Sequence, residues 1–222
     1  MKILINGDSN MSGEELTDKN LSIGSQLCKL LEGTEINLAL SGASNDRIYN
    51  TTIEYIEKKK DIDLVVIGWS EMSRVQWFMT DNGYPEFVEI NNLGVGRREY
   101  PKEYDNRLAH WFETSNKTEH RTGLSHYWHE RIYNLHKYLE YYKISHVFFH
   151  AFHDFRIHNT QYQLDWNNRF ISPYNQNYSY IYHSMNNGYK EITPGWYHFE
   201  PAAQLAWAEY MFDHIQKYNL IN

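Results

Sequence analysis

The chain has 222 residues, a formal net charge of −7 at pH 7 and 22 % charged residues, which suits a globular α/β domain and excludes a disordered chain. The acidic balance argues against nucleic acid or an anionic membrane surface as a partner, because both attract clustered Lys and Arg. The single cysteine, Cys28, excludes an intrachain disulfide and lies in an apolar helical pattern typical of a small core residue.

The sequence carries no targeting or membrane-spanning signal that we recognise. No run approaches the length of about 18 apolar residues that a membrane helix needs. The first residues enter a strand directly and lack the apolar region and cleavage site of a secretory signal. We therefore expect a protein that is cytoplasmic at synthesis and makes no contact with the membrane.

The first third of the chain alternates strands with helices. Short apolar runs predict strands over residues 2–6, 36–40 and 64–67, and the last is continuous, as in a parallel strand covered on both faces. Between them, apolar residues recur at helical spacing over residues 23–31, and a second helix begins near Ser44. This order predicts a doubly wound parallel sheet with helices on both faces.

The remainder of the chain continues the pattern between two irregular segments. Residues 72–122 and 153–195 lose the periodicity and are rich in aromatic and polar residues, so we expect insertions over the carboxyl edge of the sheet. We expect a helix over residues 125–143, a fourth strand over residues 147–149 and a last helix from Pro201. We find no repeat and no linker, which predicts one domain over residues 1–222.

Gly7-Asp8-Ser9 directly follows the first strand. This places the Ser9 hydroxyl at the carboxyl end of the sheet, where open α/β sheets build their sites. Segments 41–46 and 68–71 follow the second and third strands and end at the same edge. A last helix packed beside the first strand would bring segment 196–199, with His198, to this edge too. A serine, backbone donors and a histidine would then converge.

These segments resemble, in order and spacing, the SGNH (GDSL) hydrolase family. Gly7-Asp8-Ser9 matches the family's nucleophile block, Gly42 its second-block glycine, an oxyanion donor, and His198 its general base. The resemblance implies a flavodoxin-like three-layer α/β/α fold with a central, mostly parallel sheet. It implies the hydrolysis of esters, often on acylated sugars or lipids, without a cofactor.

The chain departs from that family at two positions. The third block usually reads Gly-x-Asn-Asp and is Gly68-Trp69-Ser70-Glu71 here, so Ser70 stands where an amide would donate to the oxyanion. The aspartate usually found three residues before the histidine is replaced by Gly195. Three other carboxylates remain as candidates for orienting the histidine, and a Ser–His dyad is the alternative; the candidates are Glu200, Asp154 and Glu71.

The expected chemistry is acyl transfer. Ser9 Oγ needs His198 to accept its proton. The backbone N–H groups of Ser9 and Gly42, with the Ser70 hydroxyl, would bind the developing oxyanion. We expect a small-molecule or glycan ester as substrate, such as an O-acyl group on a carbohydrate.

Two other functions are compatible with the composition. Aromatic residues make up 16 % of the chain, which indicates either an aromatic core or a platform for sugar rings. A catalytically impaired module of the same fold that binds glycan is therefore the second hypothesis. A phosphate or nucleotide binder is the third, although the loop after the first strand has no Gly-x-Gly-x-x-Gly or P-loop pattern.

Histidines gather in one stretch of the chain. Residues 146, 150, 153 and 158 are all His, and His126 and His129 are spaced by three, as zinc ligands can be. No His-Glu-x-x-His pattern occurs. We therefore expect no metal site.

Overall fold

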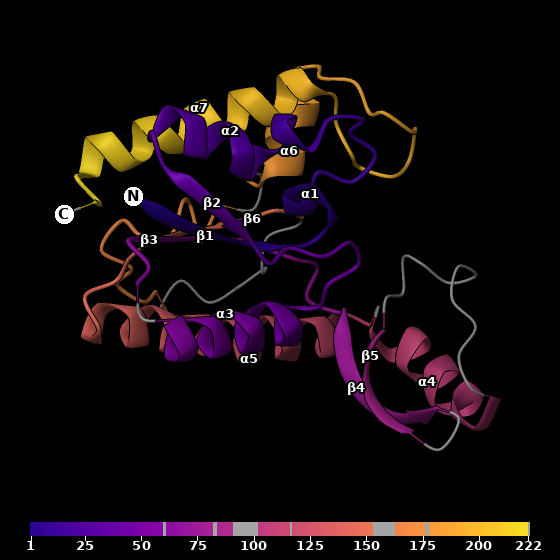
Figure 1. Ribbon diagram of the computed structural model, residues 1–222. Coiled ribbons are helices and arrows are strands. Elements are labelled where there is room, and N and C mark those ends of the chain that lie inside the picture. The colour runs from indigo at the N-terminus through magenta and orange to yellow at the C-terminus, as the bar shows by residue number, and fades with distance from the viewer. Residues whose placement is uncertain are drawn as a thin grey trace.

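The computed structural model describes residues 1–59, 61–81, 84–90, 102–115, 117–152, 163–175 and 178–221. They form the predicted three layers, with a parallel four-stranded sheet in the middle (Figure 1). The strand order is β2-β1-β3-β6. The strands are β1 (Lys2–Gly7), β2 (Thr34–Asn37), β3 (Leu64–Trp69) and β6 (Ser145–His150). The predicted α/β fold class is therefore confirmed.

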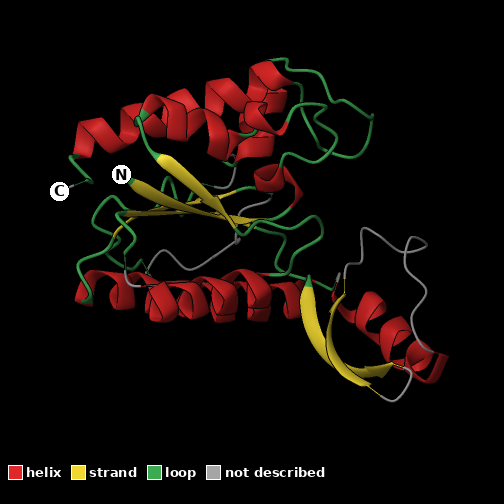
Figure 2. Cartoon of the chain, in the orientation of Figure 1, coloured by secondary structure: helices red, strands yellow, loops and turns green. Residues whose placement is uncertain are grey.

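Helices cover both faces of the sheet, as Figure 2 shows. One face carries α2 (Ile23–Leu30), α6 (Tyr180–Asn186) and α7 (Pro201–Tyr218). The other face carries α3 (Asn45–Lys59) and α5 (Thr118–Tyr141). The short helix α1 (Ser9–Ser12) and the 3-10 turn η1 (Lys19–Leu21) connect β1 to α2.

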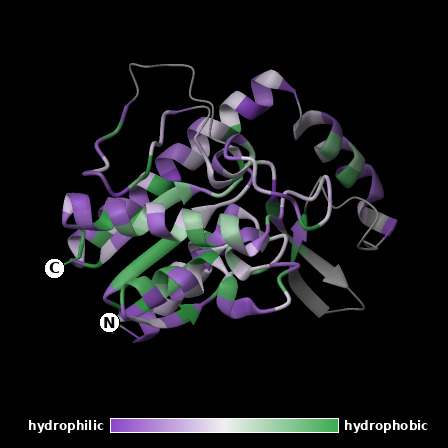
Figure 3. Ribbon diagram, turned by 90° about the horizontal axis from the view of Figure 1, so that it is seen from above, coloured by the Kyte–Doolittle hydropathy of each residue, from purple (hydrophilic) through white to green (hydrophobic). Residues whose placement is uncertain are grey.

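The alternation of side chains along β1 divides the core into two apolar layers. Ile3 and Ile5 pack with Trp207 of α7 on one face, whereas Leu4 packs with Ile48 of α3 on the other. Figure 3 shows strands of the sheet coloured mainly as hydrophobic, whereas the helices mix hydrophobic and hydrophilic residues. Each fully buried side chain of this kind stabilises the fold by about 1.5–3 kcal/mol.

Cys28 lies in the first of these layers and is 4 % exposed. Burial raises the pKa of its thiol to about 12. The thiolate is therefore scarce at neutral pH, as expected for a core residue.

The first predicted insertion has secondary structure of its own. Its described part contains an antiparallel hairpin, a 3-10 turn and a helix, which project beyond the carboxyl ends of the sheet strands in Figure 1. These are β4 (Val75–Asp81), β5 (Tyr84–Ile90), η3 (Lys102–Tyr104) and α4 (Asp105–Ser115). A separate small core of Val88, Ile90 and Leu108, with Trp77 and Trp111 packed against it, joins the hairpin to α4.

Some element boundaries differ from those we predicted. Helix α5 begins at Thr118 and not near residue 125, because its first turns pack against α4 and need no apolar stripe facing the sheet. Strand β2 ends at Asn37, although the N–H groups of Leu38 and Leu40 still donate to the Ile5 and Gly7 carbonyls, at 2.8 and 3.2 Å. Leu40 is 45 % exposed, so it does not belong to the core.

Part of the second predicted insertion, residues 153–162 and 176–177, lies outside the described residues. Its described part includes α6. Among the helices that the structure describes, none combines the length and apolar character needed to cross a bilayer.

Candidate active site

The turn after β1 has little room for side chains. A Cβ atom at Gly7 would lie 2.4 Å from the Met11 Cγ and 2.8 Å from the Gly68 carbonyl oxygen, so only glycine fits. Asp8 then caps α1, because its Oδ1 accepts the N–H of Asn10 at 3.0 Å. Ser9 is thus the first helical residue, and Asp8 is the residue that caps the helix.

The Ser9 hydroxyl is uncommitted. Ser9 is 5 % exposed, and neither its Oγ nor its backbone N–H forms a hydrogen bond with any residue that the structure describes. Its Oγ is also not among the fully buried polar atoms without a partner. The group therefore keeps some access to solvent, as a nucleophile requires.

The loop between β2 and α3 reaches the same edge of the sheet, as predicted. Leu40 bonds to Gly7 at one end of this loop. At the other end, Asn45 Oδ1 accepts the Ser70 N–H at 2.8 Å and its Nδ2 donates to the Ser70 carbonyl at 3.1 Å. Gly42 lies between these anchors with φ of 78°, in the left-handed region. Within the described part of the chain, its N–H has no hydrogen-bond acceptor.

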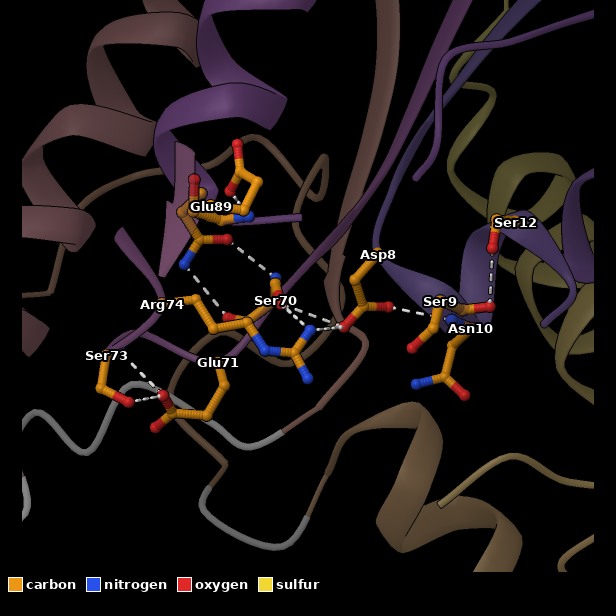
Figure 4. A network of polar contacts seen from close by, with 11 residues as sticks. Asp8, Ser9, Asn10, Ser12, Ser70, Glu71, Ser73, Arg74 and Glu89 are labelled. Atoms are coloured by element: carbon orange, nitrogen blue, oxygen red, sulfur yellow. Dashed lines mark hydrogen bonds and ion pairs between the residues drawn. The ribbon is translucent and has the colours of Figure 1, made fainter. Parts of the chain in front are cut away.

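Ser70 is held in a buried network and not directed at the nucleophile. Its hydroxyl donates to Asp8 Oδ2 at 3.0 Å and accepts from Arg74 Nη1 at 2.8 Å (Figure 4). Arg74 Nη1 also pairs with Asp8 Oδ2 at 3.1 Å. Because a hydroxyl has only one proton to donate, this geometry does not provide the oxyanion donor that we expected of Ser70.

His198 has a carboxylate partner that the sequence did not reveal. Its Nδ1 lies 2.9 Å from Oε2 of Glu15, in the turn after α1. Both side chains are largely buried, with exposed fractions of 10 and 15 %. The Nε2 atom makes no hydrogen bond to the described residues and is not among the fully buried orphan atoms. Nδ1–H therefore points at the carboxylate, and Nε2 can accept a proton.

The backbone on both sides of this contact is strained. Glu15 and Tyr197 have φ of 64° and 59°, in the left-handed region that residues with a Cβ rarely adopt. Each such residue costs about 1–3 kcal/mol and tends to occur where function requires it. The strain therefore lies at the two positions that bring Glu15 and His198 together.

Two of the three carboxylates proposed from sequence are bound elsewhere and not to His198. Glu200 accepts the N–H of Lys190 at 3.0 Å. Glu71 pairs with Arg121 at 3.1 Å and accepts the N–H of Ser73 at 2.6 Å. The third candidate, Asp154, lies outside the described residues. Glu15 was missed because no motif distinguishes it from the adjacent Glu14 in a polar turn.

Gly195 occupies the position where the SGNH family usually has an aspartate, and here it forms part of a turn. It has φ of 82°, and its N–H donates to Glu191 Oε2 at 2.6 Å. Glu191 Oε1 accepts the N–H of Tyr197 at 3.2 Å, so one carboxylate holds the turn before His198. A Cβ atom at Gly195 would have no neighbour within 4 Å. The turn before His198 is therefore held by hydrogen bonds from its backbone N–H groups to Glu191.

Phe152, just beyond β6, links the two sides of the site. The guanidinium carbon of Arg74 lies 5.2 Å from the centre of its ring. The same ring packs edge-on against Tyr197, with centroids 5.5 Å apart. The ends of β1, β3 and β6 and the segment before α7 thus meet at one place.

Most of the aromatic residues that the structure describes are either buried in the core or partly buried and packed against it. Four tryptophans are buried, namely Trp69, Trp128, Trp166 and Trp207. Trp196 is 41 % exposed, and its ring centroid lies 6.4 Å from that of His198. The composition therefore reflects packing more than a binding platform.

The histidine-rich stretch is also accounted for by packing in its described part. His136 Nδ1 lies 2.8 Å from His146 Nε2 in the core. Among the described residues, no group of three or more His, Cys, Asp and Glu side chains is arranged to hold a metal ion. His153 and His158 lie outside the described residues.

A family model matches residues 4–164, and its description is a family of unknown function (DUF6071). The chain belongs to the DUF6071 family. The matched segment contains Ser9, Glu15 and Arg74 but ends before His198. No curated protein matches the sequence.

Solved structures share the fold of this DUF6071 protein. The crystal structure of TesA matches with a TM-score of 0.54 and 11 % identity, covering 98 % of this chain and 99 % of that one. The psychrotrophic esterase EstA from Pseudoalteromonas sp., in a structure inhibited by monoethylphosphonate, matches with a TM-score of 0.53, 13 % identity and 98 % coverage of both chains. At these identities the likeness establishes the fold, which is that of the SGNH hydrolases.

Proposed function

We propose that this DUF6071 protein is an SGNH-type serine hydrolase that cleaves an ester through Ser9, with His198 as general base and Glu15 as the carboxylate that orients it. The observation that carries the proposal is the 2.9 Å contact between His198 Nδ1 and Glu15 Oε2. It leaves Nε2 to take a proton, as in a serine hydrolase triad. The uncommitted Ser9 hydroxyl at the end of β1 supports the same function.

The reaction has two acyl-transfer steps. Ser9 Oγ attacks the ester carbonyl carbon while its proton moves to His198 Nε2. The tetrahedral intermediate then collapses, the ester C–O bond breaks, and the alcohol leaves with that proton. Water next gives a proton to Nε2 and attacks the acyl-enzyme, and this proton returns to Ser9 as the acid leaves. Glu15 stabilises the imidazolium in both steps.

Backbone donors suit the developing negative charge. The N–H groups of Ser9 and Gly42 have no acceptor within the described residues, so both are free to bind an oxyanion.

For the substrate, we propose a small-molecule or glycan ester, such as an O-acyl group on a carbohydrate. The exposed Trp196 ring beside His198 supports this, because flat aromatic rings stack on sugar faces. A higher kcat/KM for an O-acetylated monosaccharide than for a straight-chain alkyl acetate is the expected result. Equal values for the two esters would contradict the carbohydrate preference.

The function is tested by p-nitrophenyl acetate hydrolysis. Ser9→Ala should lose activity by about 10⁴-fold or more, because the nucleophile is gone. Ser12→Ala is the matched control in the same helix, and it removes only a hydroxyl that donates to the Ser9 carbonyl at 3.1 Å. Its rate should stay within a few-fold of wild type.

Two outcomes would contradict the proposal. One is full turnover by Ser9→Ala. The other is no turnover by the wild type together with glycan-array binding that survives Ser9→Ala and His198→Ala, which would favour the glycan-binding alternative.

A further inference from the structure

Two buried side chains near the turn after β1 carry polar atoms that have no partner among the described residues. Arg74 is 4 % exposed, and within this part of the chain its Nε makes no hydrogen bond. Asn10, adjacent to Ser9, is 2 % exposed, and neither its Nδ2 nor its Oδ1 is bonded to a described residue. Buried polar atoms are nearly always bonded. Such donors close to a candidate nucleophile are candidates for binding an atom of the substrate.

The hydrogen-bond capacity of Arg74 is only partly used. Its Nη1 bonds to Asp8 Oδ2 and to the Ser70 hydroxyl, which accounts for both of its protons. Its Nε–H and the two Nη2 protons make no bond within the part of the chain that the structure describes. The two bonds of Nη1 hold the guanidinium in one orientation. Nη2 is not among the fully buried atoms without a partner, so it keeps solvent access and is available as a donor, whereas Nε is fully buried.

Resting on the proposed function, we propose that Arg74 donates a hydrogen bond through Nη2 to the oxyanion of the reaction, and that the Asn10 amide does the same after a small rotation of its side chain. They would replace the asparagine amide of the third SGNH block, a role that the Ser70 hydroxyl does not fill. Ser70 then has a different task, because its bonds to Asp8 and Arg74 position the guanidinium.

The arrangement of the side chains supports this assignment. Figure 4 shows Arg74 and Ser9 on opposite sides of Asp8, with the Asn10 amide next to Ser9. In this view the Ser9 hydroxyl, the Asn10 amide and the free side of the guanidinium all extend below Asp8. A carbonyl carbon attacked by Ser9 would place its oxygen among these donors and the Ser9 backbone N–H.

Charge balance also favours this role. Asp8 is fully buried and directly precedes Ser9, so its carboxylate would repel a negative charge that develops on the substrate. The guanidinium of Arg74 compensates that carboxylate at 3.1 Å and still offers N–H groups to a second oxygen anion. An arginine buried this deeply is better suited to the reacting oxygen than to an acidic group far from the ester.

The experiment separates this role from substrate binding and from structural support. It compares kcat and KM for p-nitrophenyl acetate, and the rate constant of phosphonylation by a fluorophosphonate, in Arg74→Gln, Asn10→Ala and wild type. For Arg74→Gln we expect kcat and the phosphonylation rate to fall together by about 10²–10³-fold with KM nearly unchanged. Asn10→Ala should show a parallel but smaller loss.

Arg169→Gln is the control for the loss of an arginine away from the site, although Arg169 is half-buried and Arg74 is buried. Arg169 donates to the carbonyls of Leu220 and His146, at 2.9 and 3.4 Å, away from Ser9. Its kcat per folded molecule should equal that of wild type. Arg74→Lys keeps the charge beside Asp8 but lacks the planar fork, so it should recover only a small part of the lost kcat.

Several results would overturn the inference. One is a kcat that is unchanged in folded Arg74→Gln and in folded Asn10→Ala. Another is that these substitutions change only the KM for anionic esters. If Arg74→Gln does not fold, the same comparison of kcat and KM is made with Asn10→Ala and Arg74→Lys. Wild type that lacks Ser9-dependent turnover contradicts the proposed function itself, whereas Ser9-dependent turnover with unaffected variants contradicts only this role.

Discussion

Two histidine environments in this protein differ in what surrounds the imidazole. His198 has a carboxylate at Nδ1 and no partner among the described residues at Nε2. His136 and His146 instead bond to each other at 2.8 Å in the core, and His146 Nδ1 lies 3.0 Å from the Ile144 carbonyl. In the buried pair, His146 Nδ1 donates to that carbonyl and its Nε2 accepts from His136, so the His146 ring is neutral.

The comparison shows that burial and partner together decide what a histidine can do. Burial lowers the pKa of His136 to about 4 and of His146 to about 3. These rings are therefore structural, neutral donors and acceptors. His136 also has a carboxylate nearby, since its Nε2 lies 3.5 Å from Glu140 Oε2, but its side chain is fully buried. His198 differs because its carboxylate bonds Nδ1 and leaves Nε2 with access to solvent, where a general base takes up the proton.

The largest expected effect comes from changing one histidine of each kind. His198→Gln should lower kcat for p-nitrophenyl acetate by about 10⁴-fold or more, because Ser9 loses its base. His146→Gln should leave kcat per folded molecule unchanged and lower the free energy of unfolding by about 1–3 kcal/mol, because buried hydrogen bonds are lost. Ester hydrolysis and urea unfolding of both variants measure this. The reverse pattern would show that the two environments have been assigned wrongly.

A second, smaller effect is expected from Glu15. Glu15→Gln should lower kcat by about 10²–10⁴-fold with little change in KM, because the imidazolium loses its carboxylate and the ring its fixed tautomer. Glu15→Asp should restore part of the activity. The control is Glu14→Gln at the adjacent position, which should behave as wild type.

Equal kcat in Glu15→Gln and Glu14→Gln would contradict the orienting role. A rise in KM alone would indicate instead that Glu15 contacts the substrate.

The neutral histidines also predict how stability depends on pH. Burial lowers the pKa of His129 and His136 to about 4, and that of His146 and His150 to about 3. In the unfolded chain the pKa of a histidine side chain is about 6.5. At pH values between the folded and the unfolded pKa, the unfolded chain binds protons that the folded chain does not. The free energy of unfolding is therefore highest above about pH 6.5 and falls as the pH is lowered.

The slope is at most about 1.4 kcal/mol per pH unit for each of these histidines. Urea unfolding at several pH values from neutrality downward measures it, and His146→Gln should make the slope shallower. Stability that stays constant down to pH 5 would mean that these rings are not held neutral by the fold.

The sequence predicted the fold better than the polar contacts of the site. Apolar runs such as Leu64–Ile67 are buried on both faces of a parallel sheet, so periodicity alone identifies them. Ser9 and Gly42 were located because each follows a strand of that sheet. The element that starts at Pro201 was also found, since proline suits the first turn of a helix.

Glu15 and Arg74 could not be found in this way. Their partners His198 and Asp8 are 183 and 66 residues away in the sequence, and only the tertiary fold brings them together. A carboxylate in a polar turn and an arginine after a strand are ordinary surface residues by pattern. Ser70 was misjudged for the same reason, since the partners of its hydroxyl depend on Arg74.

If the proposed function is right, Glu15 and His198 together activate Ser9. Intact-mass analysis and peptide mapping after reaction with a fluorophosphonate test this activation most directly. We expect one adduct, on Ser9, that forms rapidly in wild type and Glu14→Gln, much more slowly in Glu15→Gln and His198→Gln, and not at all in Ser9→Ala. An adduct on another residue, or labelling of Ser9 at the same rate in Glu15→Gln and His198→Gln as in wild type, would contradict it.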